Sequence, residues 1–198
     1  QFDEAERGFS IRFDGELDMR MNQSSKTSAK KIINTYTEEM LANILFMYGE
    51  LRNARAIAHT IVEARTDGVI ETSFQLRKLL QKYLPKAKEH KILAQIFQAI
   101  RIEVNEELEV LKEFLIQTPD LLSQEGRLSI ISYHSLEDRL VKRFIRTGLF
   151  DGEPEKDFFG NIHVPLMKLG KLIIPNQEEV RKNNRARSAK LRVAKLKT

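Results

Sequence analysis

The sequence predicts an α/β protein in which an all-helical module is followed by part of a doubly wound, mostly parallel sheet. Three observations predict this fold. Apolar residues recur at helical spacing between residues 37 and 84. A short β-branched run at 128–133 is followed at once by another helical stripe. Two further strand-like runs, 169–174 and 190–196, come near the end of the chain. The order helix, strand, helix is typical of doubly wound sheets.

The first elements are an extended segment and three short helices. Apolar residues alternate between Phe9 and Met21 around Asp14-Gly15, a turn signal, so a hairpin or an extended loop is expected. Thr37 suits an N-cap, with acidic residues in the turn that follows. Three helical stripes lie in the segment 20–88, and their ends are marked by Gly49, Asp67-Gly68 and Pro85.

A single long helix is predicted next, because apolar residues from Leu93 to Leu115 stay on one face through about six turns. We expect this helix to leave the helical module and enter the sheet-containing part. The segment 147–165 shows no period and is rich in Gly, Pro, Asp and Phe, which predicts a loop. The last two strands are expected to form an antiparallel pair at the edge of the sheet.

Composition excludes several classes of protein. A chain of 198 residues with 41% hydrophobic content can bury a core, so disorder is not expected. The absence of cysteine excludes disulfides, thiolate zinc sites and thiol nucleophiles. The four histidines are too scattered to indicate a metal site. No apolar run approaches the roughly 20 residues that span a bilayer, and no leader precedes the first helix, so a soluble, cytoplasmic protein without a membrane partner is expected.

Basic residues concentrate near the end of the chain. Residues 181–195 carry seven lysines and arginines and no acid, in a chain of net charge +5. On charge alone, a polyanionic partner and a solvated tail explain this run equally well. Because guanidinium groups match phosphate, Arg185 and Arg187 with Lys190 favour contact with RNA.

The polar cluster Tyr133-His134-Ser135 follows the predicted strand directly. Ligands of open α/β sheets bind beyond the carboxyl ends of strands, so these side chains are candidates for the active site. Ser135 equally suits a helix N-cap, with Glu137 and Asp138 in the first turn. His134 has no such structural assignment and could bind or orient a base, although a structural histidine is the competing interpretation.

Two other clusters are open to two interpretations each. Arg101 and Asn105 lie one turn apart on the predicted long helix, where they could meet phosphate or a base, or only solvent. The charged and apolar residues between Asp3 and Met21 suit a binding loop. From the residues alone, a solvated loop with local Asp–Arg pairing is favoured there.

Five ordered segments together resemble the MraW/RsmH family of bacterial ribosomal RNA methyltransferases: QFDEAERGFS, DGELDMRM, FQAIRIEVNEEL, GRLSIISYHSLEDRLVKRFIR and NNRARSAKLRVAKL. The resemblance implies transfer of a methyl group from S-adenosylmethionine to the exocyclic amino nitrogen of a cytosine in the decoding region of small-subunit ribosomal RNA. It also implies a class I, Rossmann-like methyltransferase sheet interrupted by a helical domain. The division would be 1–22 as a loop or hairpin, 23–92 as the inserted helical domain and 93–198 as the C-terminal part of the methyltransferase domain.

The same resemblance implies that family members carry a glycine-rich cofactor loop before the residues present here. Gln1 corresponds to the family's cofactor-contacting glutamine, and the chain by itself is expected to be inactive. The implied partners are the small ribosomal subunit and its RNA, and a homodimer is left open. His134, with Tyr133 or Ser135, would hold the base, and Arg185 and Arg187 would hold phosphates.

Two other functions remain open at this point. One is an RNA- or ribosome-binding module without catalysis, which labelled cofactor would separate from an enzyme. The other is a helical scaffold for ribosome assembly. The scaffold explains the module at 20–88 but neither the strand-end cluster nor the basic tail, and salt-sensitive RNA binding would count against it.

Overall fold

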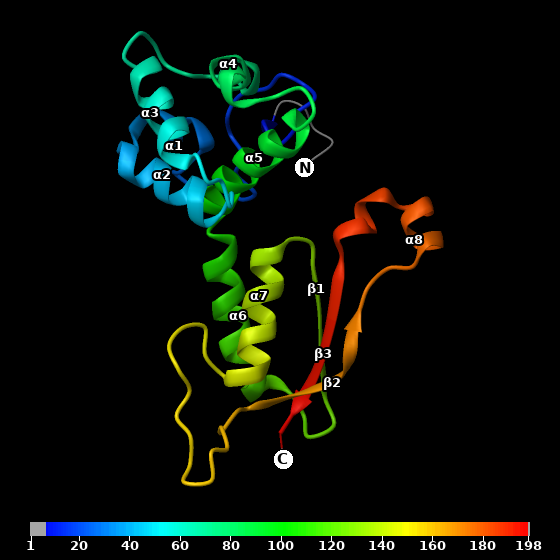
Figure 1. Cartoon of the computed structure of the whole chain (residues 1–198). Helices are drawn as coiled ribbons and strands as arrows, with labels where there is room; N and C mark the ends of the chain where they lie inside the picture. The colour runs from blue at the N-terminus through cyan, green and yellow to red at the C-terminus, as the bar shows by residue number, and fades with distance from the viewer. Residues whose placement is uncertain (1–6, 198) are drawn as a thin grey trace. The chain divides into compact units, whose positions relative to one another are not determined.

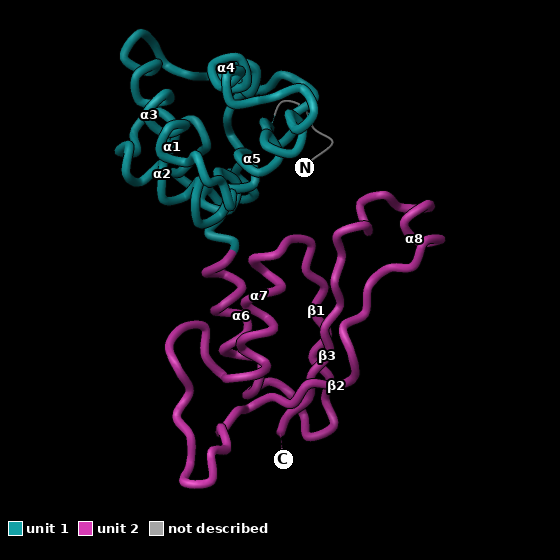
Figure 2. Tube along the Cα trace, in the orientation of Figure 1, with its two compact units in different colours: residues 1–107 teal, residues 108–198 magenta. Residues whose placement is uncertain are grey.

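The computed structural model describes residues 7–197. The chain divides into two compact units, which meet in sequence between Glu107 and Leu108 (Figure 2). Each unit is described by itself. None of the helices in the described residues is long and apolar enough to cross a bilayer. The predicted domain boundaries after residues 22 and 92 stay predictions.

The first unit is helical, as the periodicity predicts. Its helices are α1 (Ala29–Thr35), α2 (Glu38–Met47), α3 (Ala54–Ala64), α4 (Ser73–Leu79), a 3-10 turn (Gln81–Tyr83) and α5 (Glu89–Asn105). The predicted N-cap is confirmed, because Thr37 accepts a hydrogen bond from the backbone N–H of Met40. Helix α2 lies against both α3 and α5 (Figure 1). The apolar faces of these three helices share one core, which includes the fully buried Ile57, Leu93 and Ile96.

Residues 9–21 form an extended loop, so the hairpin alternative was wrong. Within this stretch the described residues make a single isolated bridge, between Glu16 and Thr72. The apolar side chains that alternate here are nevertheless used, because Phe9, Leu17 and Met19 are buried in the core of the first unit. Alternation therefore reported burial correctly for these three residues but not for Phe13 and Met21, which are 61% and 40% exposed. The loop's main pairing partner is the start of α4 rather than its own continuation.

The predicted single long helix was also wrong. Glu106 adopts a left-handed backbone conformation with φ of 50° and ends α5, and a new helix, α6 (Glu107–Leu121), begins directly after it. Apolar spacing shows which side of a helix is buried but does not report a one-residue break, because the periodic pattern continues on both sides. Within α5, the backbone N–H of Glu106 still bonds to Ile102 O.

The second unit contains the sheet. After α6 come β1 (Arg127–Ser132), α7 (Ser135–Thr147), β2 (Leu166–Ile173), α8 (Gln177–Lys182), a 3-10 segment (Asn184–Ser188) and β3 (Lys190–Leu196). The strand order is β1-β3-β2, and both pairings are antiparallel. The α/β class and the antiparallel terminal pair are confirmed. The expectation of parallel pairing was wrong for the described strands, and β1 alternates buried and exposed residues instead of being buried on both faces.

A small core holds the second unit together. Val141 and Phe144 of α7 pack with Leu115 of α6 and with Leu166 and Ala194 of the sheet. The Phe144 ring stacks on Phe150 with 5.0 Å between centroids, which fixes the start of the loop that follows α7. The sheet thus has α7 against one face, and the turn from β1 into α7 lies at the end of the first strand (Figure 1).

Candidate functional site

The turn from β1 into α7 is built as a capping box. His134 is the N-cap: its Nδ1 accepts a hydrogen bond from the backbone N–H of Glu137 at 3.4 Å. The Glu137 carboxylate accepts in return from the backbone N–H groups of His134 (3.2 Å) and Tyr133 (2.8 Å). The assignment of the N-cap to Ser135 was therefore wrong, because Ser135 is the first helical residue. Sequence favoured serine because serine is a far commoner cap than histidine.

His134 consequently has the structural role that the sequence did not assign to it. Its side chain is about a tenth exposed, and its Nε2 lies 3.4 Å from Glu137 Oε1. Because Nδ1 acts as acceptor, a neutral His134 carries its proton on Nε2, beside that carboxylate. Tyr133 differs, since 55% of its surface is exposed at the strand end. The structure thus brings the three candidate residues together, with Tyr133 the most accessible.

Asp138, one turn into α7, ties the helix to β3. Its carboxylate accepts two hydrogen bonds from Arg192, at 2.7 and 3.1 Å, and one from Lys190 at 3.3 Å. Burial by itself would raise the pKa of Asp138, but these hydrogen bonds outweigh it and hold the pKa below its ordinary value. Sequence analysis gave Asp138 only a role in the first helical turn. The alternation of Lys190 and Arg192 on one strand face is the signal that points to a buried acid opposite.

The candidate residues of the basic tail lie in two different elements. Lys190 lies in β3 and bonds to Asp138, whereas Arg185 and Arg187 lie on the 3-10 segment between α8 and β3 and are exposed. Asn183 caps that segment by accepting from the backbone N–H of Arg185 at 3.1 Å. The two arginines are therefore presented on an ordered turn rather than on a loose tail.

In the first unit, Arg101 and Asn105 hold protein structure. Arg101 donates two hydrogen bonds to the Glu107 carboxylate, at 2.7 and 2.9 Å. The Asn105 amide donates to Met19 O (2.8 Å) and Arg101 O (2.9 Å) and accepts from the backbone N–H of Met21 (2.7 Å). All amide groups of Asn105 are thus used within the unit. Contact of either residue with RNA stays a prediction.

The loop at 7–21, which Asn105 bonds to, is more ordered than its many charged residues suggested. Arg20 pairs with Asp18, as the expected local pairing requires, and its guanidinium also bonds to backbone oxygens of Gln23 (3.0 Å) and Ser25 (2.9 Å). Arg7 donates to Arg20 O at 2.7 Å. Met19, between these charges, is only 1% exposed and has a φ of 57°. A solvated loop does not describe this network.

A polar hollow of about 320 Å³ adjoins this loop. Tyr36 donates to Glu103 at 2.8 Å on its wall, and burial together with that carboxylate raises the pKa of Tyr36 to about 12. The phenol is therefore a donor at neutral pH and not a base. Amide and hydroxyl groups in the lining suit a small polar ligand; the lining residues are Met21, Asn22, Ser25, Thr27, Tyr36, Glu103, Val104, Asn105 and Glu106.

The structure does not test the prediction that Gln1 contacts the cofactor, because Gln1 lies outside the described residues. No described residue is assigned to cofactor contact.

Comparison with known proteins gives consistent matches along the whole chain. Residues 1–197 match the model of the MraW methylase family. A relative from Christiangramia forsetii is 65% identical over 98% of this chain, one from Flavobacterium johnsoniae 59% over 98%, and one from Bacteroides fragilis 49% over 99%. All three are named ribosomal RNA small subunit methyltransferase H. The chain spans 64–65% of the length of these relatives.

Proposed function

Because the chain belongs to the MraW methylase family, we propose that its parent protein is an S-adenosylmethionine-dependent ribosomal RNA methyltransferase. The match over residues 1–197, with relatives that carry this activity in their names, is the observation that supports the proposal. The proposed substrate is the exocyclic amino nitrogen of a cytosine in the decoding region of small-subunit RNA. The proposed fold of the parent is a Rossmann-like methyltransferase domain that carries an inserted helical domain.

The chemistry of this substrate indicates what the protein has to supply. The amino group of cytosine is a poor nucleophile because its lone pair is delocalised into the ring. S-adenosylmethionine supplies an electrophilic methyl group when bound. Alignment of the two reactants therefore provides most of the rate acceleration. The target base also has to be accessible, in a loop or turned out of its stack.

We assign positioning tasks to the candidate residues of the second unit. The exposed Tyr133 contacts the target base, His134 caps the turn that presents it, and Ser135 follows as the first residue of α7. Arg185 and Arg187 hold phosphates from their ordered turn. Lys190 also contacts RNA while it bonds to Asp138. In the first unit, Arg101 and Asn105 contact RNA in addition to their protein contacts. Association with the assembled small subunit, in the cytoplasm, belongs to the same proposal, and homodimer formation is left open.

Deletion of the gene tests this function. We expect small-subunit RNA from the deletion strain to lose N4-methylcytidine, measured by mass spectrometry of its nucleosides, and the full-length gene to restore it. An unchanged N4-methylcytidine content in the deletion strain would refute the substrate assignment. Subunit binding by the full-length protein without any methyl transfer would instead support a module that only binds RNA.

A further inference from the structure

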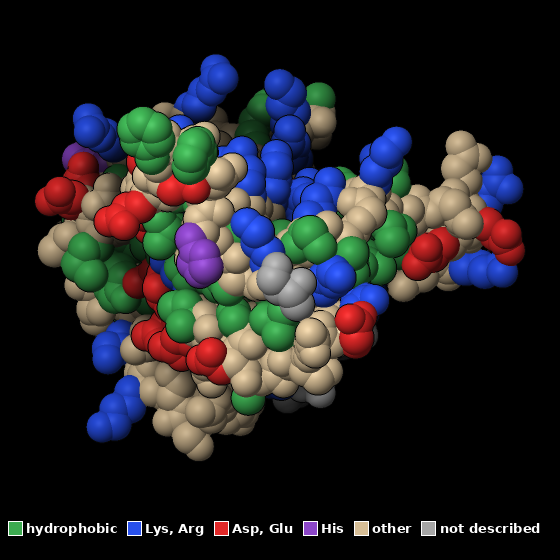
Figure 3. Space-filling model, turned by 90° about the horizontal axis from the view of Figure 1, so that it is seen from below, with side chains coloured by type: hydrophobic (Ala, Val, Ile, Leu, Met, Phe, Trp, Pro, Cys, Tyr) green, Lys and Arg blue, Asp and Glu red, His purple; other side chains and the backbone are tan. Residues whose placement is uncertain are grey.

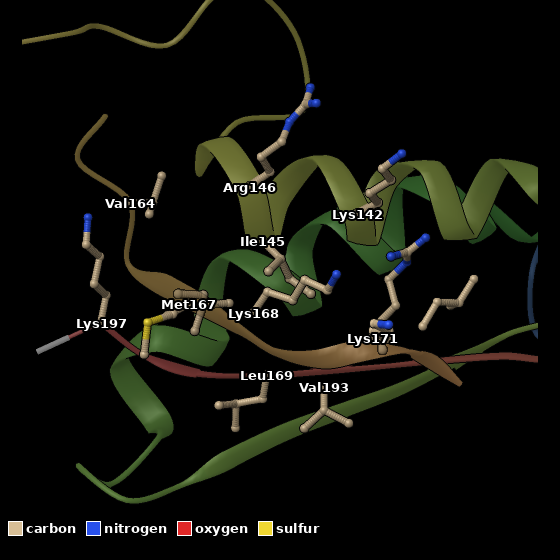
Figure 4. A pocket seen from close by; sticks show the side chains of 13 residues that line it. Lys142, Ile145, Arg146, Val164, Met167, Lys168, Leu169, Lys171, Val193 and Lys197 are labelled. Carbon is tan, nitrogen blue, oxygen red and sulfur yellow. The ribbon is translucent and has the colours of Figure 1, made fainter. Parts of the chain in front are cut away.

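A basic groove, which the methyl-transfer proposal does not use, lies between α7 and β2 in the second unit. It encloses about 400 Å³. Its basic members, besides Arg192, are Lys142 and Arg146 of α7, Lys168 and Lys171 of β2, and Lys197. No aspartate or glutamate is among its lining residues. Figure 4 shows Lys142 and Arg146 on the helix side of the groove and Lys168 between the helix and β2.

Most positive charges of this groove are not neutralised by the described part of the protein. Arg192 bonds to Asp138, but no ion pair involving Lys142, Arg146, Lys168 or Lys171 is found among residues 7–197. Clustered like charges repel one another and destabilise a compact state. A binding function explains why they line both sides of one groove.

Aliphatic side chains complete the groove. Ile145 of α7 and Val164, Met167 and Leu172 on the β2 side line it, and Met167 and Leu172 are exposed at 42% and 36%. Figure 3 shows lysine and arginine side chains gathered next to exposed hydrophobic ones on one face. The volume of the groove, about 400 Å³, lies within the range of roughly 300–1,000 Å³ found for ligand-binding clefts. This is more space than a single phosphate needs.

We propose that this groove binds a single-stranded segment of RNA, outside the site of methyl transfer. The lysines and Arg146 meet consecutive phosphates, and the aliphatic wall packs against ribose and base faces. An RNA strand fits better than an isolated anion because its charges repeat along a line. This inference rests on the proposed function, since it adds a second contact with the same RNA substrate.

Charge removal in the full-length protein tests the groove. The double variant Lys168→Gln/Lys171→Gln is compared with the wild type in binding a fluorescent 12-nucleotide single-stranded RNA, followed by anisotropy at several salt concentrations. Loss of two phosphate contacts should weaken binding about tenfold near 0.1 M salt and reduce the slope of log K against log salt by about 1.4. Both lysines are exposed, and their removal relieves repulsion, so the melting temperature should be no lower than that of the wild type.

The matched control is Lys86→Gln/Lys88→Gln, which removes the same charge from exposed lysines that do not line the groove. It should leave the salt slope at the wild-type value. Equal slopes for all three proteins would overturn the proposal. A poly-glutamate peptide whose binding depends on Lys168 and Lys171 while RNA binding does not would overturn it in favour of an acidic protein partner. N4-methylcytidine content, measured separately, shows whether the methyltransferase assignment stands even if the groove fails.

Discussion

At the scale of single residues, Asp138 has the most consequential contacts. It is 8% exposed and is the common acceptor for Arg192 and Lys190. Asp138→Asn would leave the guanidinium of Arg192 largely buried without its carboxylate. We expect the free energy of unfolding to fall by about 3 kcal/mol, measured by urea denaturation. Glu178→Gln, which breaks the exposed pair with Lys182, is the control and should leave the urea midpoint unchanged. Equal midpoints for both variants would show that the Asp138 pair is not stabilising.

The same carboxylate predicts a pH dependence of stability. The pKa of Asp138 lies below its ordinary value in the folded protein, whereas in the unfolded chain it titrates near about 4. Between these two pKa values the unfolded state binds more protons, so stability falls as the pH falls. The contribution is fully present above the unfolded pKa and is lost as the pH drops through the folded one. The difference in urea midpoint between wild type and Asp138→Asn should therefore shrink as the pH falls from 6 through the ordinary pKa of aspartate, near about 4, towards the lower pKa of the folded protein. A constant difference would contradict this.

Gly8 allows a close approach that any side chain would block. Its φ is 69°, and an added Cβ would lie 2.0 Å from the backbone oxygen of Glu16. Gly152 has the same φ of 69° but open space around it. Gly152→Ala should thus cost only the left-handed strain, about 1 kcal/mol. Gly8→Ala should cost clearly more, because the 7–21 loop must move. Thermal melting of the two variants measures the difference, and equal melting temperatures would refute the close approach.

Sequence reasoning at this scale identified residue types more reliably than their roles. It placed a polar cluster at Tyr133–Ser135, and the structure puts these residues at the turn from strand to helix. It chose the wrong cap because the cap is decided by backbone geometry, with His134 extended at φ of −132° and ψ of 165°. The sequence did not predict the partner of Asp138, because Arg192 is separated from it by 54 residues.

At the scale of elements, α7 provides a test that separates capping from catalysis. His134→Asn keeps a side-chain acceptor at the N-cap, whereas His134→Ala removes it. If His134 acts through the turn, the alanine variant should lose about 1 kcal/mol of stability and the asparagine variant should retain both stability and methylation. Denaturation and N4-methylcytidine content of the complemented strain measure the two quantities.

A catalytic imidazole gives the opposite pattern. Both His134 variants would then lose methylation, while only the alanine variant would lose stability. Tyr133→Ala is the matched comparison, because the exposed phenol makes little contribution to folding but is assigned to the base. Normal methylation with Tyr133→Ala would remove that assignment.

Helices and strands were located well because each follows from local periodicity. The strand predicted at 190–196 coincides with β3 (Lys190–Leu196). The break at Glu106 escaped prediction because it depends on one residue with positive φ inside an uninterrupted apolar pattern. The hairpin alternative at 9–21 was wrong for a related reason: the segment bonds to residues distant in the sequence, with Leu17 N–H donating to Glu71 O at 2.9 Å.

At the scale of the whole molecule, the fold class followed from the order of elements, but strand direction did not. A βαβ sequence favours parallel strands when the next strand pairs directly with the first. Here β3 pairs with β1, and β2 occupies the outer position beyond β3. That order depends on long-range pairing. Local sequence patterns therefore predicted where the strands lie but not which strands are neighbours in the sheet.

The two cores of the molecule differ in size, and this predicts unequal local stability. The core of the first unit draws on α1 to α5 and includes fully buried residues such as Leu93, Ile96 and Ile100, whereas the second core is confined to a few side chains of α6, α7 and the sheet. In the sheet, β3 is central, and β2 is an outer strand with one buried residue, Leu166.

Segments with few buried apolar contacts open at lower free energy and exchange their amide hydrogens faster. Hydrogen exchange of the full-length protein, resolved by peptide, should therefore show α5 most protected, β3 intermediate and β2 least, with α5 at least about tenfold slower than β2. In the protein alone, this order of protection follows from burial. If the basic groove binds RNA, adding a 12-nucleotide RNA should slow exchange in β2 and α7 and leave α5 unchanged. Protection of β2 equal to that of α5 without RNA would contradict the burial argument.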